Sequence, residues 1–241
     1  MKIKDAVLLV TGANRGLGLA LVREALAGGA KRVYATARDP KQLEALVRES
    51  RDRIVPLALD IEDAASLAAA ALRAPDVTML INNAGVLASY NLLASRHEDI
   101  ARDFATNTFG MLAATKAFLP ALERAGGAAL VNVLSIVSLS NMPAIGGYSA
   151  SKAAAYSFTQ GLRGELGKKH ISVHAVLAGA IDTDMVRAME MPKTSAKDVA
   201  KAIIDGVEQG LEDIYPDPAS RGMSEVWRRD PKALERQLGA S

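Results

Sequence analysis

The 241-residue chain contains no cysteine and only three histidines, His97, His170 and His174. The absence of cysteine excludes disulfides, thiol catalysis and a cysteine-ligated metal. The three histidines are scattered along the sequence and do not form the close groups that ligate zinc. We therefore expect no metal centre in this protein.

The sequence also lacks an excess of charge of one sign. It has 29 Lys and Arg against 27 Asp and Glu, a net charge of +2, and no basic cluster. Proteins that bind nucleic acid or an anionic membrane surface usually carry a concentrated basic patch. The composition therefore favours neither of these partners.

Long hydrophobic runs are missing as well, since no stretch approaches the ~20 apolar residues of a membrane span. Near the N-terminus, lysines precede the apolar run 6–10, but this run is shorter than the ~7–15 residues of a signal-peptide core. Glycines follow it in place of a small-residue cleavage site. We expect a cytoplasmic protein with no membrane segment.

What the sequence does contain is an alternation of short β-branched runs and longer segments rich in Ala, Leu and charged residues. This rhythm predicts repeated βα units, and the apolar runs without alternation predict strands buried on both faces. We expect one α/β domain over 1–241, a Rossmann-like, doubly wound parallel sheet with helices on both faces. Strands are predicted at 6–10, 32–37, 54–59, 78–82, 129–136 and 172–178, and helices at 17–27, 41–49, 63–73, 98–124, 148–167 and 196–209.

The glycine-rich stretch TGANRGLG, residues 11–18, directly follows the first predicted strand and opens the first helix. Ligands of open parallel sheets bind outside the carboxyl ends of the strands. Glycine permits positive φ there and lets backbone N–H groups approach a pyrophosphate at the positive end of a helix. The stretch predicts a dinucleotide phosphate site, and a tight turn without a ligand is the alternative.

Further motifs follow in order: NNAG at 82–85, Asn107, Ser135 and YSASK at 148–152. Thirteen positions separate Ser135 from Tyr148, and four separate Tyr148 from Lys152. Together with the glycine-rich stretch, these motifs resemble the classical short-chain dehydrogenase/reductase family, over residues 4 to at least 183. The resemblance implies an oxidoreductase that transfers hydride between a nicotinamide cofactor and a carbonyl or alcohol.

The candidate catalytic residues are Asn107, Ser135, Tyr148 and Lys152. Tyr148 and Lys152 lie four apart, and therefore on one face of a helix. An ammonium ~5 Å from the phenol would lower the tyrosine pKa of about 10 by roughly two units. The resemblance implies that Tyr148 exchanges a proton with the substrate oxygen and that Ser135 hydrogen-bonds the same oxygen. It also implies that Lys152 holds the nicotinamide ribose, and that Asn107 anchors a water.

Cofactor choice depends on the end of the second predicted strand. Members of the family that use NAD carry an acidic residue where this chain has Ala37, and Arg38 follows, with Arg15 in the glycine-rich stretch. Two guanidiniums suit a 2′-phosphate. We therefore expect NADP(H), with NAD(H) as the less favoured alternative. The resemblance places these residues against the cofactor: Gly12, Asn14, Arg15, Gly16, Leu17, Gly18, Arg38, Asp60, Ile61, Asn83, Ala84, Gly85, Tyr148, Lys152, Gly179, Ile181 and Thr183.

The family's usual Pro-Gly pair after the sixth strand appears here as Ala178-Gly179. This loop therefore lacks the fixed φ of a proline. Three mostly neutral loops, 86–92, 137–147 and 180–193, are expected to line the substrate pocket. They predict an uncharged, fairly apolar ketone, aldehyde or alcohol substrate, with the substrate loop at about 180–195.

The tail at about 212–241 contains turns at its prolines and the only tryptophan, Trp227, which we expect to pack against the protein. The resemblance implies a homodimer or homotetramer, with the helices that carry Asn107 and Tyr148 at the contact. A second hypothesis is a dinucleotide-binding redox sensor or scaffold of the same fold without turnover, because a protein can keep a fold without the catalytic activity that is usual for it. Turnover of a reduced cofactor would distinguish the two.

Overall fold

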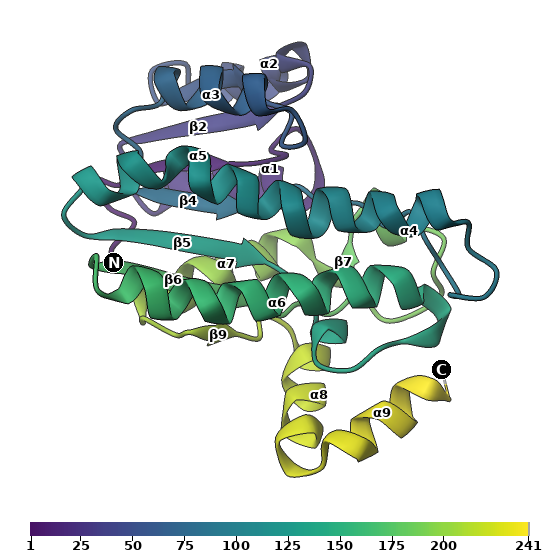
Figure 1. Cartoon of the computed structure of the whole chain (residues 1–241). Coiled ribbons are helices and arrows are strands. Elements are labelled where there is room, and N and C mark those ends of the chain that lie inside the picture. The colour runs from purple at the N-terminus through teal and green to yellow at the C-terminus, as the bar shows by residue number, and fades with distance from the viewer. Residues whose placement is uncertain (241) are drawn as a thin grey trace.

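The strands of this protein form a parallel sheet in the order β3-β2-β1-β4-β5-β6-β9, as the computed structural model of residues 1–240 shows (Figure 1). This is the expected doubly wound arrangement, in which the strand order reverses at β1. The strands are β1 (Val7–Val10), β2 (Arg32–Ala37), β3 (Ile54–Ala58), β4 (Met79–Asn82), β5 (Ala128–Val133), β6 (Ile171–Val176) and β9 (Asp213–Ile214). A separate parallel pair consists of β7 (Ile181–Asp182) and β8 (Thr194–Ser195).

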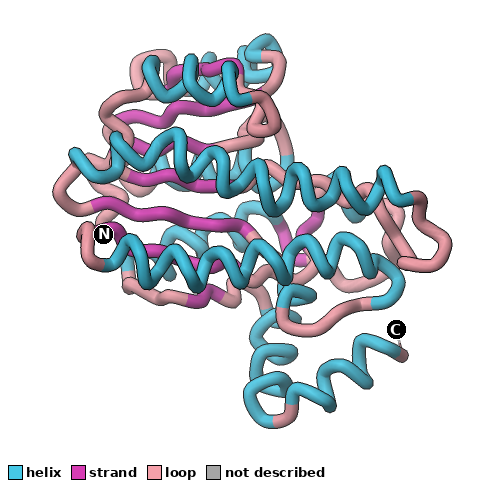
Figure 2. Tube along the Cα trace, viewed as in Figure 1, coloured by secondary structure: helices cyan, strands magenta, loops and turns pink. Residues whose placement is uncertain are grey.

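Helices cover both faces of the sheet, as Figure 2 shows. The α-helices are α1 (Gly16–Ala27), α2 (Glu44–Glu49), α3 (Ala64–Arg73), α4 (His97–Phe104), α5 (Met111–Arg124), α6 (Gly146–Gly167), α7 (Ala196–Glu208), α8 (Pro218–Arg229) and α9 (Pro231–Gly239). Short 3₁₀ turns lie at Pro40–Leu43, Ile136–Ser138, Pro143–Ile145 and Asp184–Val186. The fold class predicted from the sequence is confirmed.

Strand β1 contributes apolar side chains to two hydrophobic clusters, one on each face of the sheet. Leu8 and Val10 join the cluster beneath α1 and α7, while Val7 and Leu9 join the cluster beneath α3 and α5. Successive strand side chains point to opposite faces, so a strand covered on both sides must be apolar throughout. The absence of alternation in the sequence follows from this double burial.

The structure differs from the prediction in several places. The predicted helix 98–124 is interrupted by a π-helical turn, Ala105–Gly110, which contains Asn107. The C-terminal prolines begin helices instead of marking turns, because Pro218 and Pro231 each occupy the first turn behind a capping aspartate. Proline fits this position because the backbone N–H it lacks has no partner there anyway. Strand β9 was missed because it is only two residues long.

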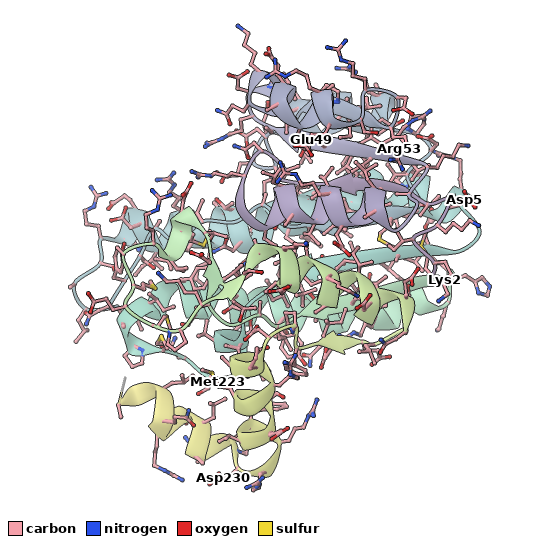
Figure 3. The ribbon with its side chains drawn as sticks, turned by 180° about the vertical axis from the view of Figure 1, so that it is seen from behind. Lys2, Asp5, Glu49, Arg53, Met223 and Asp230 are labelled. Carbon is pink, nitrogen blue, oxygen red and sulfur yellow. The ribbon has the colours of Figure 1, made fainter. Side chains whose placement is uncertain are left out.

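Helices α8 and α9 form a hairpin that stands away from the sheet (Figure 1). Seen from behind, Met223 lies where α8 meets the body of the molecule and Asp230 lies at the far turn (Figure 3). None of the described helices is long and apolar enough to cross a membrane.

Candidate active site

A cleft of about 590 Å³ opens at the carboxyl ends of the central strands, where the strand order reverses. We call it the cofactor cleft. The structure brings all of the predicted cofactor-binding residues and Ser135 to its lining, whereas Asn107 lies behind it. The lining residues from the prediction are Gly12, Asn14, Arg15, Gly16, Leu17, Gly18, Arg38, Asp60, Ile61, Asn83, Ala84, Gly85, Tyr148, Lys152, Gly179, Ile181 and Thr183.

The glycine-rich turn is held in place by residues at the end of β4. Gly12 has a φ of +65°, and a Cβ on Gly18 would lie 2.2 Å from the Gly12 carbonyl oxygen, so neither position accepts a side chain without strain. The Thr11 hydroxyl accepts hydrogen bonds from the backbone N–H groups of Asn83 and Ala84, both at 2.9 Å. The Asn83 side chain donates to the carbonyls of Thr11 and Gly12. Thr11 and Asn83 together therefore fix the turn, a role that the sequence analysis assigned to neither residue.

The end of β2 presents a cation to the cleft. Arg38 lines it and makes no side-chain hydrogen bond or ion pair within the described structure. The neighbouring Asp39 also lines the cleft, and its carboxylate accepts a hydrogen bond from the backbone N–H of Lys41 at 3.0 Å and thereby caps the following 3₁₀ turn. Arg15 instead reaches across the cleft to Asp184, 3.5 Å away, through an exposed ion pair. Arg38 is thus the better placed of the two arginines to receive an anion.

Gln42 is a cleft residue that the sequence analysis missed. Its side chain lines the cleft and accepts a hydrogen bond of 2.7 Å from the amide of Asn14. The only signal was its position in the 3₁₀ turn Pro40–Leu43, a few residues beyond β2 and Arg38.

Tyr148 and Lys152 project from the first turns of α6 toward the ends of β4 and β5. The Lys152 ammonium lies 5.8 Å from the centroid of the Tyr148 ring and donates a 3.0 Å hydrogen bond to the carbonyl of Val133. Ser135 follows β5. Its hydroxyl donates a hydrogen bond of 3.4 Å to the Ala178 carbonyl, and its interaction with the Tyr148 phenol lowers the pKa of that phenol. The fold therefore gathers a phenol, an ammonium and a hydroxyl at one end of the cleft.

Burial dominates the electrostatics of this group. It raises the pKa of the Tyr148 phenol to about 12, an effect that the hydrogen bond from Ser135 opposes. It also lowers the pKa of the Lys152 ammonium to about 8. The sequence-based expectation of a lowered tyrosine pKa is wrong for this structure, because it counted the lysine charge and left out the cost of burying a phenolate. The protonated phenol is the stable form at neutral pH.

Asn107 lies in the π-helical turn and is almost completely buried. Its side-chain oxygen accepts from the backbone N–H of Val86 at 2.9 Å, and its amide donates to the Val86 carbonyl and to the Ser151 hydroxyl. These bonds join the loop after β4 to α6. They occupy the side chain, so in this structure Asn107 positions two elements of the site.

The backbone at Gly85 lies close to this group. A Cβ there would lie 3.1 Å from the Asn107 side-chain oxygen and 3.5 Å from the Lys152 ammonium. The cleft thus combines a glycine cradle at its N-terminal turn, a free cation beside β2 and hydrogen-bonding groups at its far end. This donor set fits the phosphates, the adenosine and the nicotinamide ribose of a dinucleotide.

Tyr148 packs against an apolar cluster. Each of the three loops predicted to line the substrate pocket contributes to it, and so does α8. Its members are Leu87, Ile136, Val137, Leu139, Met142, Ile145, Met189, Tyr215 and Met223. The sequence analysis missed Tyr215 and Met223, because nothing in the pattern of the C-terminal stretch showed that it folds back to this cluster.

Asp217 is a further residue that the sequence analysis missed. It is 1% exposed, caps α8 through the backbone N–H of Ser220, and accepts a 2.8 Å hydrogen bond from the backbone N–H of Gly179. Gly179 belongs to the loop in which Ala178 replaces the family's proline. A carboxylate from the C-terminal hairpin therefore restrains the loop.

Comparison with known proteins identifies the class that this fold and site define. Residues 6–193 match the family model of short chain dehydrogenases, so the chain belongs to this family. It is an oxidoreductase, and its cofactor is a nicotinamide dinucleotide.

Two curated relatives illustrate the range of the family. The uncharacterized oxidoreductase YusZ of Bacillus subtilis is 36% identical over 66% of this chain, and the matched region covers 59% of YusZ. A 3alpha-hydroxysteroid dehydrogenase of Mediterraneibacter gnavus is 30% identical over 78% of this chain and 79% of its own length.

Solved structures match over nearly the whole chain. A short chain dehydrogenase from Burkholderia cenocepacia in complex with NADP superposes with a TM-score of 0.93, at 36% identity over 99% of both chains. One from Burkholderia phymatum in complex with NAD superposes with a TM-score of 0.86, at 23% identity over 97% of this chain and 96% of that one. At that identity the second structure supports the fold alone.

Proposed function

We propose that this protein is an NADP(H)-dependent oxidoreductase that interconverts a carbonyl compound and the corresponding alcohol, with Tyr148 as the general acid and base. The observation that carries the proposal is the convergence of Tyr148, Lys152 and Ser135 at one end of the cofactor cleft, next to an apolar cluster that can receive a substrate. A bound nicotinamide would supply or accept the hydride.

Each member of this group has a distinct task in the proposal. Tyr148 holds a proton at its phenol oxygen at neutral pH and donates it to the oxygen of a carbonyl substrate. Ser135 donates a hydrogen bond to the same oxygen and stabilises the negative charge that develops there. Lys152 binds the nicotinamide ribose and stabilises the phenolate once the proton has left. Asn107 positions the loop after β4 against α6.

The preference for NADP(H) rests on Arg38. Its guanidinium lines the cleft without a partner among the described residues, and β2 ends in Ala37 where an acidic residue would repel a 2′-phosphate. The NADP-bound Burkholderia cenocepacia structure supports this preference. NAD(H) is the less favoured alternative.

We propose an uncharged, fairly apolar substrate. The cluster around Tyr148 consists of aliphatic side chains, methionines and one further tyrosine, Tyr215, with the Arg228 guanidinium 5.2 Å from the centroid of that ring. Burying a charge costs free energy unless the charge is paired, so the predominantly apolar cluster favours an uncharged substrate. A relative named for steroid oxidation agrees with an apolar ketone or secondary alcohol.

We also propose a homodimer or homotetramer. Phe109, in the π-helical turn, is 58% exposed, and α6 begins with small residues that permit close helix packing. Pairing of these helices between two copies would bury the phenyl ring. Light scattering of the purified protein coupled to gel filtration measures the oligomeric state directly.

The activity is tested by following NADPH absorbance with a panel of aromatic and aliphatic ketones and aldehydes. The proposal predicts consumption that depends on the carbonyl substrate and is fastest with apolar compounds. Tight NADPH binding without turnover of any panel member would instead favour a dinucleotide sensor or scaffold.

A further inference from the structure

Asp103, on α4, is a completely buried carboxylate that the proposed chemistry does not use. One of its oxygens accepts from the backbone N–H of Ala88 at 2.9 Å. The other accepts from the backbone N–H of Ser89 at 3.0 Å and from the Ser89 hydroxyl at 2.5 Å. Three donors from one loop compensate for the burial of the charge. Asp103 therefore fixes the backbone of the loop after β4, which also supplies Leu87 to the apolar cluster.

The Asp103–Ser89 pair lies directly against the beginning of α6. A Cβ on Gly147 would come within 2.2 Å of the Ser89 hydroxyl oxygen, so only glycine leaves room for the pair at this position. The next residue of α6 is Tyr148. The carboxylate and its loop are thus packed against the turn of helix that carries the proposed acid.

The negative charge of Asp103 acts on both titrating groups of the site. Burial has the larger effect on each pKa, but the carboxylate raises the pKa of the Tyr148 phenol and also that of the Lys152 ammonium. The other polar groups that face this pair are the Ser135 hydroxyl and the Val133 carbonyl, and both are uncharged. Asp103 is the one charged group among the described residues that contributes to both pKa values, and its contribution is smaller than that of burial.

We propose that Asp103 is a positioning residue that holds the loop after β4 against α6 through Ser89 and supplies a fixed negative charge beside Tyr148 and Lys152. The charge adds to the effect of burial, which favours the protonated phenol, and it opposes the effect of burial on the ammonium, so both groups are favoured in the state required to donate a proton to a carbonyl. This inference rests on the proposed function of Tyr148, and it adds a residue that touches neither substrate nor cofactor.

The test compares the pH dependence of kcat/KM for alcohol oxidation in the wild type, Asp103→Asn and Ser89→Ala. Asp103→Asn removes the charge and keeps the shape, so both pKa values should fall. The rising limb of the profile should then move to lower pH by on the order of one unit. Ser89→Ala loses one hydrogen bond and keeps the charge, so it should raise the substrate KM and leave the profile in place. Circular dichroism and NADPH binding show whether each variant is folded.

Several results would overturn the inference. One is an unshifted profile in folded Asp103→Asn, and another is an equal shift in Ser89→Ala, which would assign the effect to loop geometry. Asp103→Ser is a second neutral variant that leaves an acceptor for one backbone N–H. If neither neutral variant folds, the carboxylate serves stability and the inference fails. An inactive wild type would contradict the proposed function instead, so the two failures are distinguishable.

Discussion

The carboxylate of Asp217 accepts a hydrogen bond of 2.8 Å from the backbone N–H of Gly179. It also caps α8, and a Cβ on residue 179 would lie 2.7 Å from its other oxygen. One buried aspartate thereby joins the loop of Ala178 and Gly179, which lines the cofactor cleft, to the C-terminal hairpin. The loop obtains from this contact the restraint that a proline at position 178 would otherwise provide.

Asp217→Ala should therefore weaken NADPH binding as well as the fold. Loss of the cap and of the bond to Gly179 should lower the free energy of unfolding by about 1–3 kcal/mol. Asp230→Ala is the matched control, because Asp230 caps α9 in the same way at the far turn of the hairpin. Fluorescence titration should show weaker NADPH binding only for Asp217→Ala. Equal NADPH affinity in the two variants would contradict the proposed role of Asp217.

Arg38→Ala should weaken NADPH much more than NADH. A charge-assisted hydrogen bond contributes roughly 1.5–3 kcal/mol, which corresponds to about one to two orders of magnitude in affinity. NADH has no 2′-phosphate to lose. The measurement is kcat/KM for both cofactors, with Arg73→Ala at the exposed end of α3 as the control. If both cofactors lose equally, or if the wild type already prefers NADH, Arg38 is not the ligand of the 2′-phosphate.

Lys152→Met should change how stability depends on pH. The pKa of Lys152 is lowered from 10.5 to about 8 in the folded protein, so the unfolded chain binds this proton more tightly between these values. The contribution of Lys152 to the free energy of unfolding therefore rises with pH across that window. Below about pH 8 the buried ammonium costs about 3 kcal/mol, at 1.4 kcal/mol for each pKa unit.

The stability advantage of Lys152→Met over the wild type should accordingly be greatest near neutral pH and shrink toward about pH 10. Urea unfolding of both proteins at several pH values measures the difference. A difference that is constant across this range would show that the ammonium is not destabilised by burial. The variant should also bind NADPH more weakly, because the proposed ribose ligand is lost.

The fold class and the position of the cleft could be predicted from the sequence because both follow from local signals. Strand β1 is apolar on both faces, and the glycines after it mark a turn in which Gly18 has no room for a side chain. Tyr148 and Lys152 share a helix face at a spacing that the sequence displays directly. Each of these features depends on a few residues that are neighbours in the sequence.

The rest depends on contacts between distant segments. Asp217 hydrogen-bonds to Gly179, which lies 38 positions earlier in the sequence. Asp103 hydrogen-bonds to Ser89 in a loop whose conformation cannot be predicted from the hydrophobic pattern. The Tyr148 pKa was predicted in the wrong direction because burial is a property of the folded chain. The C-terminal helices were missed because their prolines signal turns as strongly as helix starts, and only the capping by Asp217 and Asp230 distinguishes the two.

The central claim is that the Tyr148 phenol transfers a proton to the substrate oxygen, and removal of one oxygen atom tests it. Tyr148→Phe should bind NADPH like the wild type, while its turnover falls by at least the ~10²–10⁴ that general acid–base catalysis contributes. Tyr156→Phe is the matched control on the same helix. The Tyr156 hydroxyl hydrogen-bonds to Asp213 at 2.9 Å, and neither Tyr156 nor Asp213 lines the cofactor cleft.

The deciding measurement is kcat for NADPH-dependent reduction of the best panel substrate in the wild type, Tyr148→Phe and Tyr156→Phe. We predict that Tyr156→Phe keeps wild-type turnover and that Tyr148→Phe loses at least about a hundredfold with unchanged NADPH affinity. A folded Tyr148→Phe variant that retains a turnover within about tenfold of the wild type would contradict the role of Tyr148 as the proton donor.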